Sequence, residues 1–356
     1  MDIYENDNKM KIKNRKISQS EKPFIIAELS ANHNKSLDKA LTLVKKAAEA
    51  NADAIKLQTY TADTMTFNLD SDQFMIRDKS SPWNGRHMYE LYQEAHTPWE
   101  WHEEIFNYAN NLNLLAFSSP FDDTAVDFLE ELNVPAYKIA SFECVDTQLI
   151  KKVAKTGKPL IISTGMANKQ EIAEAVQVAR KNGCEELSLL KCTSNYPASP
   201  KNTNISSIPV MRDLHDCQVG LSDHTMGFGV ACAAISYGAT IIEKHLTLDR
   251  SEGGVDSGFS TEPDEFSMLV SEVHKAWEAK GEIFFGETES EKNSRKRRRS
   301  LYFSEDISSG EILSARHIKR VRPGYGLEPK HFDEIIGKKL KRSVKMGQPI
   351  TWNDIE

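Results

Sequence analysis

Two stretches that follow one another along the chain decide the fold: "GLSDHT" (Gly220–Thr225) and "IIEKHLTLD" (Ile241–Asp249). In each, small or apolar residues run into a histidine, first His224 and then His245. Continuous apolar runs of this length are typical of strands buried on both faces, as in a parallel sheet. Either each histidine is an accident of packing, or the fold brings both imidazoles to one place.

Six more strand-like runs precede this pair, and stretches with helical spacing separate all eight. One of these stretches, "NKQEIAEAVQVARKNG", is closed by Gly183. Eight apolar strands, each followed by a helix, predict an α/β fold of the (β/α)8 TIM-barrel type. A doubly wound open sheet is the alternative, but it usually has fewer strands and a Gly-rich first turn, which "AELSANHN" lacks. The runs span residues 24–29, 54–60, 114–120, 136–141, 159–165, 187–194, 217–224 and 240–247.

The chain divides into two expected domains. We expect a TIM-barrel catalytic domain over residues 1–285, with an N-terminal extension over 1–22 and a lid insertion within 61–113. A polar linker would occupy 286–299, and a small β-rich domain 300–356. That domain echoes itself: "DISSGEILSARHI" (306–318) and "SVKMGQPITWNDI" (343–355) share the spacing of an apolar residue, a Gly and two further apolar residues.

Composition restricts the possible partners. The formal net charge is −7 and the pI about 5.9, so no overall basic field attracts nucleic acid. The basic run Arg295–Arg299 is better explained as a solvated linker segment. The N-terminal stretch is polar and predicts neither a signal peptide nor a membrane span. Five cysteines without a CxxC pattern predict reduced thiols and a cytoplasmic protein.

The carboxyl ends of the predicted strands carry polar side chains. In parallel barrels all eight loops converge there, so chemistry gathers at that end. Lys56 and Lys138 lie within apolar strands and require an anionic partner, either a ligand or an internal ion pair with a residue such as Glu28. The other strand-end groups are Gln58, Ser118, Ser119, Ser141, Ser163, Thr164, Thr193, Ser194, Ser222, His224, Glu243 and His245.

Together these residue types indicate a definite chemistry. The two lysines, with hydroxyls from Ser119, Ser141, Ser163 and Ser222, would form a cradle for a phosphate or carboxylate. A single strand-end histidine is usually structural, but His224 and His245 on neighbouring strands suggest a shared metal. Two imidazoles with an acidic neighbour and open positions suit Mn²⁺, Mg²⁺ or Co²⁺. A phosphorylated small acid beside a Lewis acid is the implied ligand.

At these positions the sequence resembles the sialic acid synthase family, from about residue 23 to the end of the chain. The tail, with "RRSLYFSEDISSGEIL" and "RPGYGLEPKHF", is similar to the antifreeze-like (SAF) domain that ends these synthases. "ELSANHN", "GGVDSGFS" and Ser194, where sialate-making members typically carry Asn, point to the pseudaminate branch. The motifs that carry the family resemblance are "IIAELSANHN", "IKLQTYTADTMT", "YKIASFE", "ISTGM", "CTSNYPA", "GLSDHT" and "EKHLTLDR".

The resemblance implies condensation of phosphoenolpyruvate with an amino sugar, here 2,4-diacetamido-2,4,6-trideoxy-L-altrose. A neuraminate or legionaminate synthase is the alternative within the family. A metal-dependent hydrolase and a non-enzymatic sugar-binding scaffold are the alternatives outside it. The phosphoenolpyruvate site would comprise Lys56, Ser119, Lys138, Ser141, Ser163, Ser194 and Ser222. The sugar site would comprise Glu28, Gln58, Tyr196, Glu243, Asp256 and Arg322. The catalytic residues would be Glu28, Asp256, Lys56 and Lys138.

The resemblance also implies a homodimer. In the family, the arginine that matches Arg322 reaches into the barrel of the neighbouring subunit and contacts the N-acetyl group of the sugar. Arg322 precedes a Pro-Gly turn in "RVRPGYG" (320–326), which would project the guanidinium from a loop. A surface salt bridge is the simpler explanation of this arginine. On the resemblance to the family, we expect each tail domain to cap the barrel of its partner.

Overall fold

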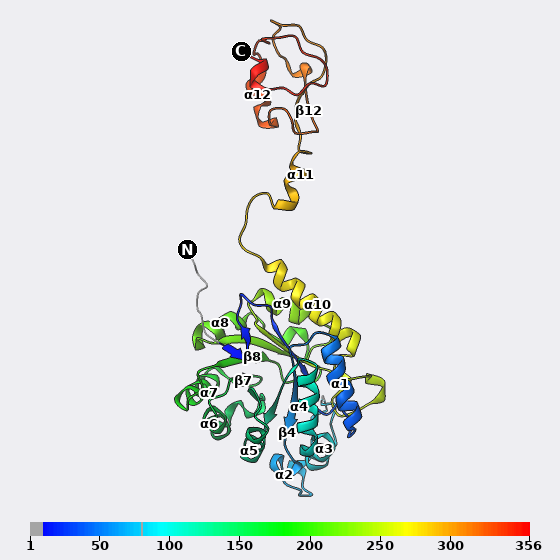
Figure 1. Cartoon of the computed structure of the whole chain (residues 1–356), viewed down its shortest axis with the longest axis vertical. Coiled ribbons are helices and arrows are strands. Elements are labelled where there is room, and N and C mark those ends of the chain that lie inside the picture. Colours follow the sequence, from blue (N-terminus) through cyan, green and yellow to red (C-terminus); the bar gives the residue numbers. More distant parts are fainter. Residues whose placement is uncertain (1–9, 80) are drawn as a thin grey trace. The chain divides into compact units, whose positions relative to one another are not determined.

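The structure is a computed structural model that describes residues 10–79 and 81–356. It divides into two compact units, Met1–Gly281 and Glu282–Glu356, which are described separately (Figure 1). The first unit is a closed barrel of eight parallel strands in the order β10-β3-β4-β5-β6-β7-β8-β9, which confirms the predicted fold. Its strands are β3 (Phe24–Glu28), β4 (Ala54–Thr59), β5 (Leu115–Pro120), β6 (Tyr137–Ile139), β7 (Leu160–Ser163), β8 (Leu187–Cys192), β9 (Gln218–Asp223) and β10 (Ile241–His245).

The barrel strands are buried on both faces because helices cover the outside and side chains fill the inside. β3, β9 and β10 have no exposed residue at all. Their charged residues are therefore buried as well and form ion pairs, such as Lys244 with Asp223. Gly220 in β9 is required by close packing: a Cβ there would overlap the carbonyl oxygen of Ile241 in the neighbouring strand. The carboxyl ends of β9 and β10, which carry the motifs GLSDHT and IIEKHLTLD, therefore lie side by side.

Helices alternate with the strands, and α7 shows the capping at both ends that its sequence predicts. Asn168 caps α7 by accepting from the backbone of Gln170 and Glu171, and Gly183 follows the helix with a φ of 101°. The helices of the first unit are α1 (Leu37–Glu49), α2 (Ala62–Met65), α3 (Met88–Ala95), α4 (His102–Asn111), α5 (Asp123–Glu131), α6 (Thr147–Ala154), α7 (Lys169–Lys181), α8 (Ser207–His215), α9 (Gly229–Ser236) and α10 (Pro263–Lys280).

Ahead of the barrel lies a short antiparallel hairpin of β1 (Met10–Ile12) and β2 (Arg15–Ile17). Arg15 donates to Asp53, the residue that precedes β4, over 2.8 Å. The hairpin therefore lies against the amino end of the barrel, opposite the end where chemistry is expected. Residues 1–9 of the predicted N-terminal extension lie outside the described residues.

The long connection between β4 and β5 contains both a barrel helix and extra structure. α4 is the helix of this β/α repeat, whereas α2, the 3₁₀ helix Asp72–Phe74 and α3 form the additional segment. Residue 80 of this segment lies outside the described residues. The extra structure comes directly after the carboxyl end of β4 and so begins at the end of the barrel that we call the mouth.

The second unit has its own core and a two-fold internal repeat. It contains α11 (Lys292–Arg295), β11 (Ser300–Phe303), β12 (Ile318–Val321) and α12 (Phe332–Ile335). The repeated positions 307 and 344, 313 and 350, and 318 and 355 are all buried in one cluster. Gly310 and Gly347 are also equivalent, with φ values of 88° and 82° that favour glycine. The echo in the sequence therefore corresponds to a repeated structure.

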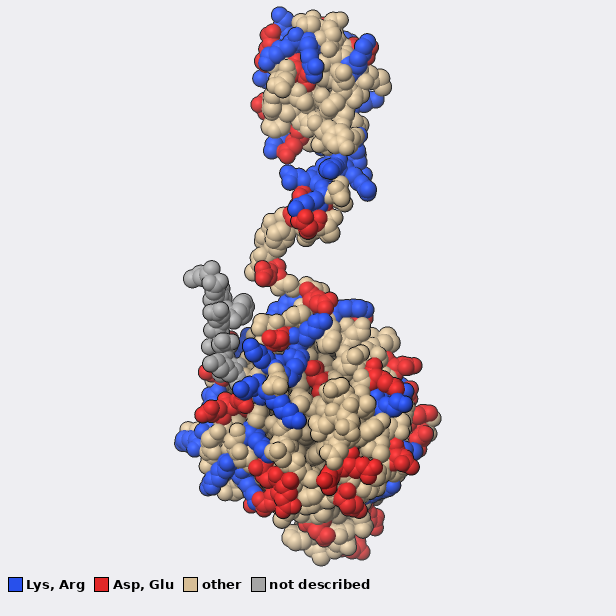
Figure 2. Space-filling view, in the orientation of Figure 1, with Lys and Arg blue, Asp and Glu red and all other residues tan. Residues whose placement is uncertain are grey.

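The basic segment that leads into this unit is exposed and mixed with acidic residues (Figure 2). Arg295 lies 3.4 Å from Glu287, and Lys292 pairs with Glu289 over 2.5 Å. These contacts agree with a solvated segment. In the described part of the chain no helix has both the length and the apolar character needed to span a bilayer. All five cysteines are free thiols.

Candidate active site at the barrel mouth

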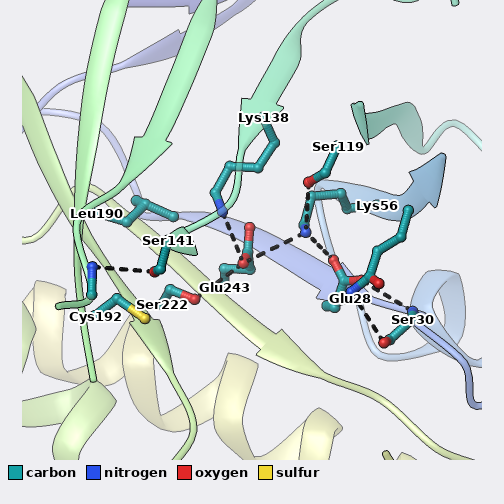
Figure 3. A network of polar contacts seen from close by, with 12 residues as sticks. Glu28, Ser30, Lys56, Ser119, Lys138, Ser141, Leu190, Cys192, Ser222 and Glu243 are labelled. Carbon is teal, nitrogen blue, oxygen red and sulfur yellow. Dashed lines mark hydrogen bonds and ion pairs between the residues drawn. The ribbon is translucent and has the colours of Figure 1, made fainter. Parts of the chain in front are cut away.

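Polar residues from β3, β4, β5, β6, β9 and β10 converge at the mouth of the barrel (Figure 3). Glu28, Lys56, Lys138 and Glu243 are each at most 4 % exposed. Burying four charged groups together is costly unless they pair with one another. The arrangement of these pairs therefore defines the centre of the candidate site.

Lys56 pairs with Glu28 on the adjacent strand and also donates to Ser119 over 3.2 Å. Gln58 donates to the same carboxylate over 3.2 Å and to the hydroxyl of Ser30 over 3.1 Å. The internal ion pair considered for Glu28 is thus present. The role of Lys56 in binding an anionic ligand stays a prediction.

Glu243 lies between the two buried lysines. One of its carboxylate oxygens is 3.5 Å from the ammonium of Lys138 and 3.8 Å from that of Lys56. The hydroxyl of Ser222 donates to the same oxygen over 3.1 Å. Two ammonium groups therefore converge on a single carboxylate, which is a suitable position for a second anion to bind.

Burial and pairing shift the pKa values of the four charged groups in different directions. Burial raises the pKa of the Glu28 carboxyl to about 7, although Lys56 opposes the shift. Burial also acts to raise the pKa of Glu243, but Lys138 and Lys56 outweigh it and lower that pKa. Burial lowers the pKa of Lys138 despite Glu243, whereas Glu243 and Glu28 outweigh burial and raise that of Lys56. Glu243 is therefore the fixed counter-ion of this cluster.

The predicted hydroxyl groups gather at a second corner, beside β7 and β8. The backbone N–H of Gly165 donates to the hydroxyl of Ser141 over 3.2 Å. A Cβ at position 165 would overlap Ser141 and Ser194, so only glycine fits between them. The buried hydroxyl of Ser163 has no hydrogen-bond partner among the described residues. A buried polar group without a partner is unusual in folded proteins and suggests that a ligand completes this corner.

His224 and His245 are brought together, as the opening motifs predict. Their ring centroids are 5.3 Å apart. The Nδ1 of His224 lies 3.1 Å from the carbonyl oxygen of Thr193, which leaves its Nε2 free of that contact. The Nδ1 of His245 is buried without a partner in the described part of the chain. Burial also lowers the pKa of His245 well below its usual value, so this ring is neutral at pH 7.

Two imidazoles with free ring nitrogens suit a divalent cation, so the donor set fits the predicted metal. No group of three or more His, Cys, Asp or Glu side chains within residues 10–79 and 81–356 is arranged to hold a metal ion. A cation held by His224 and His245 would therefore take its remaining ligands from water or substrate oxygens.

Aromatic and acidic side chains surround the two histidines. The ring of Tyr196 lies 4.5 Å from that of His224, and the ring of Phe259 lies 5.1 Å from that of His245. Asp256, on the same loop as Phe259, accepts a hydrogen bond from Ser30, and burial raises its pKa. The predicted sugar-binding residues Gln58, Tyr196 and Asp256 thus lie next to the histidine pair and the Glu28 cluster.

The additional segment after β4 contributes one wall of the mouth. The indole N–H of Trp83 donates to the carbonyl of Val255 over 2.8 Å. Its ring lies 5.5 Å from the ring of Tyr196. Together with Arg86 and Glu94, these residues line a cavity of about 420 Å³. The insertion thus packs directly against the loop that carries Asp256.

Three residues at the mouth were missed in the sequence. Glu143 follows β6 in a 3₁₀ helix, and its Oε2 is buried without a partner among the described residues. Burial raises the pKa of its carboxyl to about 7. Ser30 links Gln58 and Asp256, and the thiol of Cys192 lies 3.8 Å from the Nδ1 of His224. All three lie in or beside motifs quoted above, but nothing in their residue type marks them.

Arg322 belongs to the second unit and is exposed. The ion pairs formed within its own unit, among the described residues, do not include Arg322, so nothing there supports the salt-bridge explanation. The loop that carries Arg322 is anchored, because the N–H of Gly324 donates to the carbonyl of Lys296 over 2.9 Å. Its predicted contact with the sugar stays a prediction.

An eight-stranded parallel barrel with converging ionisable groups at the carboxyl ends of its strands defines a TIM-barrel enzyme. Residues 43–284 match the NeuB family, and residues 298–356 match the SAF domain. The chain belongs to the NeuB family, which confirms the resemblance seen in the motifs.

Relatives match along almost the whole chain. A pseudaminic acid synthase of Campylobacter jejuni is 43% identical over 94% of this chain and 97% of its own length. An N,N'-diacetyllegionaminic acid synthase of the same species is 35% identical over 91% and 97%. The fold is also similar to the crystal structure of an N-acetylneuraminic acid synthetase from Leptospira borgpetersenii in complex with citrate, with a TM-score of 0.71. The two sequences are 30% identical, and the match covers 80% of this chain and 94% of that one.

Proposed function

We propose that the protein condenses phosphoenolpyruvate with 2,4-diacetamido-2,4,6-trideoxy-L-altrose to give pseudaminic acid and inorganic phosphate. It is then a metal-dependent transferase that joins two carbon chains. The observation that carries the proposal is the convergence of Lys56 and Lys138 on one oxygen of Glu243. The buried hydroxyl of Ser163, which has no partner among the described residues, supports it. A pocket that offers two ammonium groups and several hydroxyls suits a compact phosphorylated acid.

In the proposed reaction the new bond joins C3 of phosphoenolpyruvate to the aldehyde carbon of the open-chain sugar. The aldehyde oxygen takes up a proton and becomes a hydroxyl, while C2 of phosphoenolpyruvate becomes cationic. Water then adds to C2 and loses its proton. The bond between C2 and the bridging oxygen breaks, so inorganic phosphate leaves and C2 becomes the ketone of the product.

The lysines and hydroxyls act on the phosphoenolpyruvate. Lys56 and Lys138 neutralise its phosphate and carboxylate, and Ser119, Ser141, Ser163, Ser194 and Ser222 supply or support hydrogen bonds. We assign proton transfer to Glu28 and Asp256, because both buried carboxylates accept hydrogen bonds from Ser30. Tyr196, Gln58 and Glu243 complete the walls of the sugar site.

His224 and His245 would hold a divalent cation, Mn²⁺, Mg²⁺ or Co²⁺. When bound, such an ion supplies Lewis-acid polarisation of the sugar aldehyde. The neutral ring of His245 and its partner-free Nδ1 support this assignment.

The choice of sugar rests on the comparisons. The chain is 43% identical to a pseudaminic acid synthase and 35% identical to a legionaminic acid synthase of the same bacterium. The expected result is phosphate release with the L-altrose sugar and little release with N-acetylmannosamine or the legionaminate precursor. Phosphate release together with the product mass, measured across this panel of sugars, tests the proposal. Equal rates of phosphate release with all three sugars would contradict the proposal that the protein is specific for the pseudaminic acid precursor.

The SAF domain would complete the site in a homodimer. Arg322 is exposed on an anchored loop, which supports a contact with a second chain. Each C-terminal unit would then cap the barrel of the partner subunit and present Arg322 to the N-acetyl group of the sugar. The five free thiols agree with a reducing, cytoplasmic location.

A further inference from the structure

Each of the two histidines follows a charged residue that no ligand can reach. Asp223 precedes His224, and Lys244 precedes His245. Their side chains are 0 % and 1 % exposed. Because successive residues of a strand point to opposite faces, the histidines face the mouth while Asp223 and Lys244 face the surrounding helices.

Lys244 ties the end of β10 to the turn that follows β9. Its ammonium donates to the carboxylate of Asp223 over 2.8 Å and to the carbonyl oxygen of Thr225 over 2.5 Å. The other oxygen of the Asp223 carboxylate accepts from the backbone N–H and the hydroxyl of Thr225, over 2.9 and 2.8 Å. His224 is therefore held on both sides by residues bound to Lys244, the neighbour of His245.

This pair differs from the other buried ion pairs of the barrel. Lys56, Lys138, Glu28 and Glu243 lie at the mouth, where a ligand can bind, but the Lys244 pair does not. A buried ion pair is a weak source of stability, since apolar side chains of similar size often serve as well. What apolar side chains cannot supply is a set of directional contacts that fixes the turn at residues 223–225.

We propose that the Lys244–Asp223 pair sets the separation and orientation of His224 and His245, and thereby the affinity of the metal site. Asp223, Thr225 and Lys244 are positioning residues, because they act through the histidines and touch neither substrate nor metal. The inference rests on the proposed function, since it assumes that the two imidazoles hold a divalent cation. Loss of a residue that orients a metal ligand typically weakens metal binding about 10- to 100-fold.

Mn²⁺ binding to the full-length protein, followed by electron paramagnetic resonance, tests the inference. We expect Lys244→Met and Asp223→Asn each to raise the Kd for Mn²⁺ at least tenfold. Calorimetry without metal should show the Kd for phosphoenolpyruvate changed by less than about threefold, because the lysine cradle is left intact. A milder pair covers the case in which these variants do not fold: Thr225→Val removes the hydroxyl bond to Asp223 and should weaken Mn²⁺ binding, whereas Thr225→Ser should restore it.

Asp53→Asn is the matched control. Asp53 also pairs with a basic side chain and accepts a backbone N–H, from Arg15 and Ile25 over 2.8 Å each, but at the amino end of the barrel. This variant should lose thermal stability and keep its Mn²⁺ affinity.

Two results would overturn the inference, and they are distinguishable. If the Lys244, Asp223 and Thr225 variants lose thermal stability but bind Mn²⁺ like the unmodified protein, the pair is only structural. If the unmodified protein binds no Mn²⁺, or His245→Ala binds it equally well, the metal assignment itself fails and the inference fails with it.

Discussion

His224 and His245 end neighbouring strands of the barrel with their ring centroids 5.3 Å apart. Replacing either by Ala should abolish condensation because it removes a metal ligand. The fold should persist, because the loss of buried volume is small compared with the whole core. A chelator should have the same effect, reversed by added divalent metal. The measurement is phosphate release alongside circular dichroism.

His102 provides the control for that pair. It is buried 2.8 Å from the hydroxyl of Thr59, between α4 and β4, and takes no part in the mouth. The His102→Gln variant should still catalyse condensation, and its activity should still depend on metal, even if the variant is less stable. Full activity of the unmodified protein in metal-free buffer would exclude the metal assignment.

The second prediction concerns the lysines that converge on Glu243. Lys56→Met and Lys138→Met keep most of the apolar stem but delete the charge, so binding of phosphoenolpyruvate should weaken by about 2 kcal/mol or more. That is roughly a thirtyfold rise in Kd, measurable by calorimetry. Lys56→Met also leaves Glu28 without its partner, and combining it with Glu28→Gln should recover stability but not affinity. Normal binding with reduced thermal stability would show that the lysines are only structural partners.

The third prediction is a pH dependence of stability that originates from Glu143. Burial raises the pKa of this carboxyl in the folded protein to about 7, from its ordinary value of 4.5. The folded protein therefore holds a proton that the unfolded chain has released, so stability falls as the pH rises from 4.5 to 7. Glu143→Gln removes this loss and should stabilise the protein by on the order of 1–3 kcal/mol at pH 8, and by almost nothing at pH 4.

Thermal unfolding at pH 4, 6 and 8 measures this difference, with Glu171→Gln as a control. Glu171 accepts the backbone N–H of Asn168 at the start of α7, where its replacement should not give a gain that grows with pH. We expect Glu143→Gln to lower turnover of the sugar at the same time, since its carboxylate interacts electrostatically with Lys138 and Tyr196 at the mouth. A stability gain independent of pH would contradict the account of Glu143.

The fourth prediction concerns Arg322 and the C-terminal unit. Truncation after about residue 290 should leave a folded barrel that binds phosphoenolpyruvate but scarcely turns over the sugar. Mixing an Arg322→Ala chain with a His245→Ala chain should restore some activity, because one of the two sites in a mixed dimer receives both intact groups. If subunit exchange is demonstrated and the mixture stays inactive, Arg322 does not act on the partner's site.

The eight strands could be predicted from the sequence to within two residues, because runs such as Phe24–Glu28 are largely apolar, short and bounded by turns. The repeat in the C-terminal unit was equally readable, since the equivalent glycines 310 and 347 and their apolar neighbours are spaced alike. The hairpin at residues 10–17 was not recognised. Its alternating Met10, Ile12 and Ile17 are buried, but the lysines between them dominate the composition.

The pairing at the mouth could not be predicted, because it depends on the register of the closed barrel. Lys56 lies opposite Glu28 in the β3–β4 ladder, and Glu243 reaches both lysines from a strand almost 190 positions further on than Lys56. A lysine in an apolar strand signals an anionic partner without saying which one. Glu143 escaped notice because it belongs to a short 3₁₀ helix rather than to a strand end.

The fate of the bridging oxygen of phosphoenolpyruvate shows whether the C2–O bond breaks during condensation with the sugar. The full-length protein is incubated with Mn²⁺, 2,4-diacetamido-2,4,6-trideoxy-L-altrose and phosphoenolpyruvate carrying ¹⁸O between C2 and phosphorus, and both products are analysed by mass spectrometry. The account predicts that the label leaves entirely with inorganic phosphate and that the nine-carbon acid carries none. Label retained in the acid, or phosphate released without any nine-carbon acid, would contradict it.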